Sequence, residues 1–92
     1  MNATTTAHLT TSRSGHPQPV LEVRLPRGSH HRLVSATLHE LAAKAERATA
    51  AGEGWVIYTE QHAGEGGRVV VELAQATEAE AARALAMLRG LV

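Results

Sequence analysis

The spacing of hydrophobic residues changes several times along the chain, and the order of these changes limits the possible folds. Residues 20–25 alternate in hydrophobicity, which predicts a half-buried strand. A helical stripe follows over residues 30–51. Strand patterns return over residues 55–60 and 68–73, and a second helical stripe occupies residues 78–89. The chain therefore predicts the order β-α-β-β-α.

Capping signals indicate where the two helices begin and end. Ser29 precedes the first helical stripe and is expected to be its N-cap, and Gly52 is expected to follow its last turn. Thr77 and Glu80 have the spacing of a capping box, with Thr77 as N-cap. Gly90 is expected to end the second helix.

The first nineteen residues contain Thr, Ser, His, Gly and Pro and little that is apolar. Such a segment buries too little surface to offset the entropy of ordering it. We therefore expect residues 1–19 to form a disordered N-terminal tail and residues 20–92 to form a single α+β domain.

The order of elements predicts a three-stranded antiparallel sheet with both helices on one face, because a right-handed crossover leaves room for the third strand between the first two. Residues 61–67 are rich in glycine and are expected to be the loop of a hairpin. The arrangement resembles a ferredoxin-like architecture that lacks its fourth strand, of which Leu91 and Val92 could be a stub. An architecture of this kind carries no function by itself.

Composition excludes several classes of chemistry. The 92 residues include no cysteine and no aspartate, and nine basic residues balance nine glutamates. Disulfides, thiol catalysis and thiolate metal sites are therefore excluded. Neutrality argues against general binding to nucleic acid or to membrane surfaces. No stretch has the pattern of a transmembrane span or a secretory signal, so we expect a cytoplasmic protein.

The sheet face away from the helices is the first candidate site. Residues 55–58 are all apolar, so the pattern leaves open which side of that strand is buried. Either choice puts an aromatic and an aliphatic side chain outside, and such patches often mark interaction surfaces. A small, alanine-rich core would also gain from association. We expect a non-catalytic interaction or regulatory module that forms a homodimer, or binds a partner protein, through this face or a sheet edge. The candidate interface residues are Arg24, Trp55, Ile57, Tyr58 and Val70.

The start of the first helix is an alternative site. Free N–H groups and the helix dipole at a helix N-terminus attract anions. Basic residues gather there, and Arg68 could add to them. This pattern favours binding of a phosphate, from a nucleotide or a nucleic acid. The expected contacts are Arg27, Ser29, His30 and Arg32.

A second alternative is a small dimeric α+β-barrel enzyme. It would use histidine, Tyr58 or the strand glutamates Glu22, Glu60 and Glu72 in a cleft between sheet and helices. No spacing of a nucleophile and its base is visible, so we name no catalytic residue. The six histidines lack the spacing of a zinc motif. We expect no metal and no cofactor.

Overall fold

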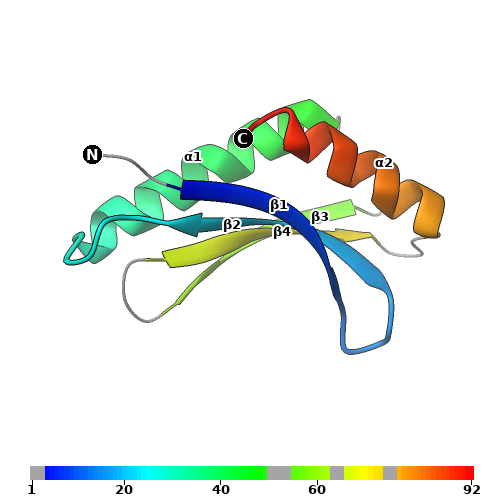
Figure 1. Ribbon diagram of the computed structural model, residues 1–92, viewed down its shortest axis with the longest axis horizontal. Coiled ribbons are helices and arrows are strands. Elements are labelled where there is room, and N and C mark those ends of the chain that lie inside the picture. Colours follow the sequence, from blue (N-terminus) through cyan, green and yellow to red (C-terminus); the bar gives the residue numbers. More distant parts are fainter. Residues whose placement is uncertain (1–3, 50–54, 63–65, 74–76) are drawn as a thin grey trace.

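The computed structural model describes residues 4–49, 55–62, 66–73 and 77–92. Four strands and two helices follow one another in the order β-β-α-β-β-α (Figure 1). They are β1 (Thr4–Thr11), β2 (Pro17–Arg24), α1 (His31–Thr49), β3 (Trp55–Gln61), β4 (Gly66–Leu73) and α2 (Glu78–Arg89).

The strands form one antiparallel sheet in the order β1-β2-β4-β3. Both helices lie on the same face: α1 packs on β3 and β4, and α2 packs on β1 and β2 (Figure 1). The sheet arches beneath the helices, and the β1–β2 hairpin bends away from them at one end. The face opposite the helices is called the open face below. The α+β class and the antiparallel sheet are confirmed.

The core lies between the sheet and the helices. Alternate residues of β2 and β4 point into it, where they meet one stripe from each helix. The helices fit this position because their apolar residues recur at helical spacing. The fully or almost fully buried members include Leu21, Val34, Leu38, Val69, Val71, Ala81 and Leu88.

The predicted disordered tail is wrong for residues 4–19, and the sheet has four strands instead of three. Thr4–Thr11 forms β1, which pairs with β2 along its whole length. Threonine is β-branched and favours strands, so this segment needs little hydrophobicity to become an edge strand. The turn is closed by the Ser12 N–H, which donates to the His16 carbonyl at 2.8 Å. Gly15 there has a φ of +85°, a conformation that favours glycine.

Two further predictions about the chain's organisation need correction. The residues Leu91 and Val92 follow α2 as a turn and do not begin a strand, although Leu91 packs against the core. Ser29 is not the N-cap of α1, because the first helical hydrogen bond runs from the Val34 N–H to the His30 carbonyl at 3.1 Å. The Ser29 hydroxyl instead donates to the Pro26 carbonyl at 2.6 Å. The cap is His30, whose ring Nδ1 accepts from the Arg32 N–H at 3.1 Å.

The start of α2 confirms the predicted cap. The Glu80 N–H donates to the Thr77 hydroxyl oxygen at 3.2 Å, and that hydroxyl donates to the Glu80 carboxylate at the same distance. Gly90 follows the helix with an ordinary φ of −68°. Gly52 and residues 63–65 of the predicted hairpin loop lie outside the described residues. Neither helix within the described ranges is both long and apolar enough to cross a membrane.

Candidate interaction surface

The structure places the five predicted interface residues on two different faces. Trp55 and Ile57 point toward the helices and pack against the core. Tyr58 lies on the open face, where Val70 is its cross-strand neighbour and is fully buried. Arg24 is exposed at the far end of β2. The five residues therefore do not form one continuous patch.

The open face is polar, and its two central valines are covered. Register places His8, Val20, Val70 and Tyr58 in one row across the four strands. Both valines have no exposed surface, although no helix lies on this side. Longer polar side chains on the neighbouring rows flank them. Sequence alternation alone could not show this burial, because the flanking residues come from several strands.

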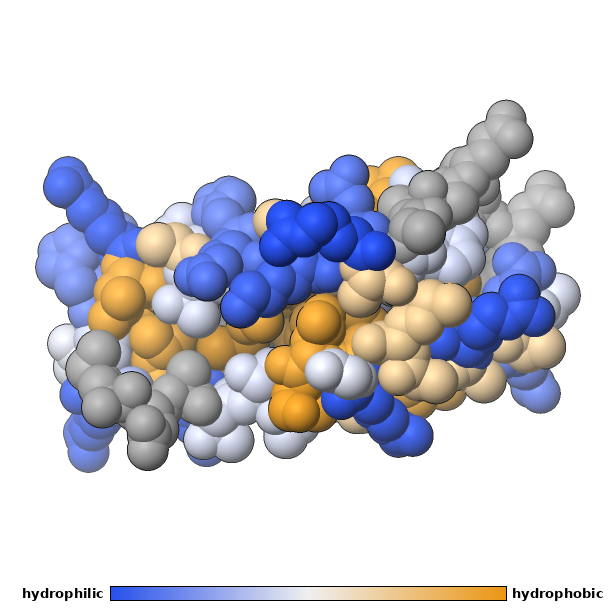
Figure 2. Space-filling view, turned by 90° about the horizontal axis from the view of Figure 1, so that it is seen from above, coloured by the Kyte–Doolittle hydropathy of each residue, from blue (hydrophilic) through white to orange (hydrophobic). Residues whose placement is uncertain are grey.

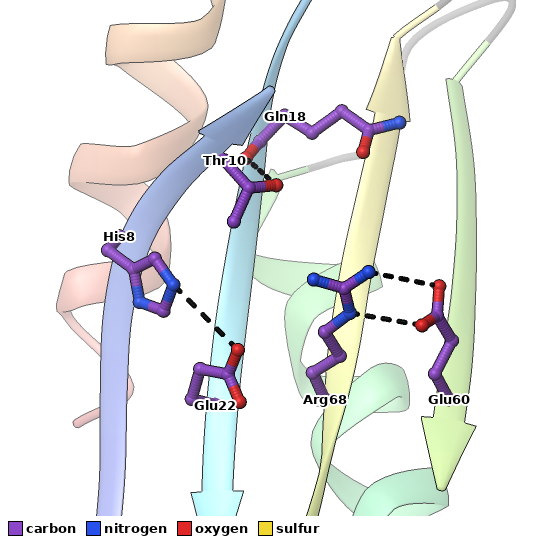
Figure 3. A network of polar contacts seen from close by, with 6 residues as sticks. All are labelled: His8, Thr10, Gln18, Glu22, Glu60 and Arg68. Carbon is purple, nitrogen blue, oxygen red and sulfur yellow. Dashed lines mark hydrogen bonds and ion pairs between the residues drawn. The ribbon is translucent and has the colours of Figure 1, made fainter. Parts of the chain in front are cut away.

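Polar contacts join neighbouring strands on the open face (Figure 3). Arg68 reaches Glu60 through two contacts, Nε to Oε2 at 3.1 Å and Nη2 to Oε1 at 3.4 Å. His8 Nε2 lies 3.8 Å from Glu22 Oε1. Arg68 therefore belongs to the open face, on the side of the sheet opposite to the helices, and it does not extend the cluster at the start of α1.

Two shallow hollows lie on the open face. One, of about 460 Å³, is bordered by the β1–β2 turn and the centre of the face, and its lining includes Arg13, Gln18, Tyr58, Arg68 and Glu72. The other, of about 520 Å³, lies at the opposite end and is lined partly by Thr6, His8, Glu22, Arg24 and His62. Both contain charges of both signs. Sequence reasoning missed Thr6, His8, Arg13 and Gln18 because it assigned residues 1–19 to a tail.

Tyr58 provides a spectroscopic test of the open face. Burial raises the pKa of Tyr58 above its ordinary value of 10.0, the carboxylates of Glu60 and Glu72 raise it further, and the Arg68 guanidinium acts in the opposite direction. Because Tyr58 is the one tyrosine of the chain, its ionisation can be followed by ultraviolet absorbance. We expect a midpoint above that of the chain unfolded in denaturant.

The same titration has a mutational control and a consequence for stability. Glu72→Gln should lower the pKa of Tyr58, whereas Glu46→Gln on the exposed side of α1 should leave it unchanged. Since the folded pKa lies above the unfolded one, the folded state binds the proton more tightly. This contribution to stability is present below pH 10 and is lost as the pH rises through the folded value. Equal midpoints in the folded and unfolded chains would contradict this placement of Tyr58.

At the two free edges of the sheet, the hydrogen-bond pattern shows which backbone N–H and carbonyl groups point outward. Hydrogen-bonded and non-hydrogen-bonded pairs alternate along an antiparallel ladder. Ser12 and His16 are hydrogen-bonded, so in β1 the even-numbered residues bond to β2. His62 and Gly66 are likewise hydrogen-bonded, so in β3 the even-numbered residues bond to β4. The outward backbone groups are those of Thr5, Ala7, Leu9 and Thr11 in β1, and of Trp55, Ile57, Thr59 and Gln61 in β3.

The β1 edge lacks the usual protection against pairing. Natural edge strands are often blunted by charged residues, prolines or bulges. β1 has eight residues and contains no Lys, Arg, Glu or Pro, and it keeps one register with β2 throughout. Leu9 points to the helix side of this edge and is 42% exposed. Such a strand is a ready template for another strand.

The prolines of β2 fit the same derivation. Pro17 and Pro19 occupy non-hydrogen-bonded positions opposite β1, so their nitrogens face the β4 side. Proline has no N–H to donate there, and pairing between β2 and β4 correspondingly begins only at Val20. The agreement supports the assignment of inward and outward backbone groups in β1.

The predicted anion site at the start of α1 has fewer free donors than the sequence suggested. The Arg32 N–H is bonded to the His30 ring, and the Leu33 N–H donates to the His30 carbonyl at 2.9 Å. The His30 and His31 rings lie 4.3 Å apart. Arg27 is exposed in the turn that precedes the helix. Among the described residues, no three His or Glu side chains are placed to hold a metal ion.

Comparisons with protein-family models, with curated proteins and with solved structures give no match to this chain.

Proposed function

We propose that this chain is a non-catalytic protein-interaction module that associates with itself through a free edge of its sheet. The observation that carries this proposal is the uncharged β1 edge, with a row of outward N–H and carbonyl groups in regular register. Addition of a strand to such an edge forms main-chain hydrogen bonds and is a recurring mode of protein recognition. Association would also increase the fraction of surface that this small domain buries.

The surface pattern favours an edge over either face. On the open face, Val56 is the one large hydrophobic residue that stays exposed among the described residues, at 55%. On the helix side, apolar areas are separated by strongly hydrophilic side chains (Figure 2). Leu33, Met87 and Val92 are exposed on that side. An edge needs no continuous apolar patch, because its backbone groups supply the contact.

The position of the carboxylates supports a non-catalytic role. The alternative enzyme needs acid–base groups in a cleft between the sheet and the helices. Glu22, Glu60 and Glu72 instead share the open face, away from the helices. The space between sheet and helices is filled by buried apolar side chains such as Leu38 and Val71. Of the three, Glu60 is held by Arg68 and Glu22 lies beside His8.

The test is the molar mass in solution, measured by light scattering over a range of protein concentration. We expect the wild-type chain to reach twice its mass of 9.7 kDa. The double variant Ala7→Pro/Thr59→Pro removes one outward N–H from each edge without touching the ladders inside the sheet, and it should remain a monomer. Glu72→Lys reverses a charge on the open face and should still dimerise.

Two results would overturn the proposal. One is a wild-type monomer at every concentration up to the millimolar range. The other is a dimer that survives both prolines and is broken by Glu72→Lys, which would place the interface on the open face. Circular dichroism of each variant confirms that the fold is retained, so that a monomer is not the result of unfolding.

A further inference from the structure

Resting on the proposed function, we infer that the partner is a second copy of this chain that pairs antiparallel on β1, with the two-fold axis at His8. The two free edges of the sheet are not equivalent. β3 contains the charged Glu60, and the Gln61 side chain donates to the His31 carbonyl of α1 at 3.1 Å. That contact ties the end of the β3 edge to the helix. β1 contains no Lys, Arg or Glu. Within the described residues, no side chain of β1 is hydrogen-bonded to a helix.

The outward groups of β1 define the register. When two identical strands pair antiparallel, the numbers of any two residues that face each other add up to the same total along the whole pair. Thr5, Ala7, Leu9 and Thr11 all form hydrogen-bonded pairs only when that sum is 16, so that Thr5 faces Thr11 and Ala7 faces Leu9 of the second copy. Any other even sum places at least one of these four residues opposite a residue outside β1. An odd sum places them opposite residues whose backbone groups face β2. This register puts His8 opposite His8 of the second copy, on the axis.

The side chains that meet in this register are compatible on both faces. On the helix side, the exposed Leu9 lies beside the half-buried Ala7 of the second copy, and the contact occurs twice because the interface is two-fold. On the open face, Thr6 meets Thr10, and threonine pairs are favourable across strands. His8 faces the identical ring of the second copy on the axis, and Glu22 lies beside each ring.

The helices also leave room for the second copy. α2 lies over β1 and β2, and two strand spacings amount to about 10 Å. The second copy's α2 would therefore lie about one helix diameter away across the axis. Along this edge α2 presents the small residue Ala82, which borders a hollow with Leu9 and Thr11. The result is one continuous sheet made from both four-stranded sheets, with every helix on one side.

A single cysteine tests this arrangement, because the chain contains none. In His8→Cys, the two new thiols would occupy a non-hydrogen-bonded pair with Cα atoms about 4.5 Å apart, a distance that a disulfide spans. The matched control is Thr6→Cys, on the same strand and face. Its counterpart would lie four residues along the strand, about 13 Å away, which is too far for a disulfide. Tyr58→Cys places a thiol at the centre of the β3 edge in the same way.

Under mild oxidation, we expect His8→Cys to form a covalent dimer about tenfold faster than Thr6→Cys or Tyr58→Cys, because pairing raises the local thiol concentration. Faster cross-linking of Tyr58→Cys would overturn the inference and leave the proposed function intact, with β3 as the interface. Equal, slow rates in a protein that light scattering shows to be dimeric would also overturn it. If light scattering shows that the wild-type chain is a monomer, the proposed function and this inference are both wrong.

Discussion

Deletion of residues 1–16 is expected to abolish cooperative folding or to remove most of the stability of the chain. The deletion removes all eight residues of β1, which pair with β2 along their whole length. At about one ladder bond per residue and about 1 kcal/mol for each, the loss is about 8 kcal/mol. A domain of this size has a total stability of about 5–15 kcal/mol. The helix side of β2 would also lose cover, since Ala7 packs against the core.

The measurement is chemical unfolding followed by circular dichroism, with deletion of residues 1–3 as the control. The control ends before β1 and should keep the wild-type midpoint. If the longer deletion also kept that midpoint, residues 4–16 would contribute nothing to the fold, as the composition of the segment suggests. The experiment thus separates a structural strand from a tail.

Gly67→Ala is expected to destabilise the fold by about 3 kcal/mol through overpacking. A Cβ atom at Gly67 would lie 2.6 Å from the Glu60 carbonyl oxygen and 2.6 Å from Cδ1 of Leu38. Leu38 could shift, but the Glu60 oxygen belongs to the backbone of the neighbouring strand. α1 can therefore approach β4 this closely because residue 67 has no side chain.

Gly90→Ala is the matched control for this substitution. Gly90 has an ordinary negative φ, and the nearest atom to an added Cβ is 3.3 Å away. We expect a change of less than about 0.5 kcal/mol, as for most surface positions. Denaturant midpoints can be read from the fluorescence of Trp55, the one tryptophan of the chain, which packs against the core. Equal losses in the two variants would contradict the close approach at Gly67.

Local periodicity predicts most of the elements that follow residue 19, because those elements carry strong patterns. α1 and α2 have clear apolar stripes, and Thr77 lies at the cap that its spacing with Glu80 predicts. β1 was missed because its segment is polar. The strand is held by pairing with β2 and by the β propensity of threonine, and a hydrophobicity argument considers neither of these.

The interaction surface could be predicted only in part, since it depends on register between strands. The first four residues of β3 are all apolar, so their pattern does not show which side of the strand is buried. In the structure, Trp55 and Ile57 lie opposite core residues of β4 and face the helices. Val20 and Val70 are buried on the open face, where they are flanked by side chains from different strands. Their burial could therefore not be predicted from one strand at a time. Outward backbone groups on β1 become definable only once the Ser12–His16 hydrogen bond is known.

Amide hydrogen exchange along β1 tests the central claim most directly, because it reports the two sides of the strand separately. The N–H groups of Thr6, His8 and Thr10 face β2 and should be protected at every protein concentration. Those of Thr5, Ala7 and Leu9 face the free edge. They should be protected in concentrated solution and lose protection on dilution. Outward amides that exchange freely at all concentrations would show that no second copy pairs on this edge.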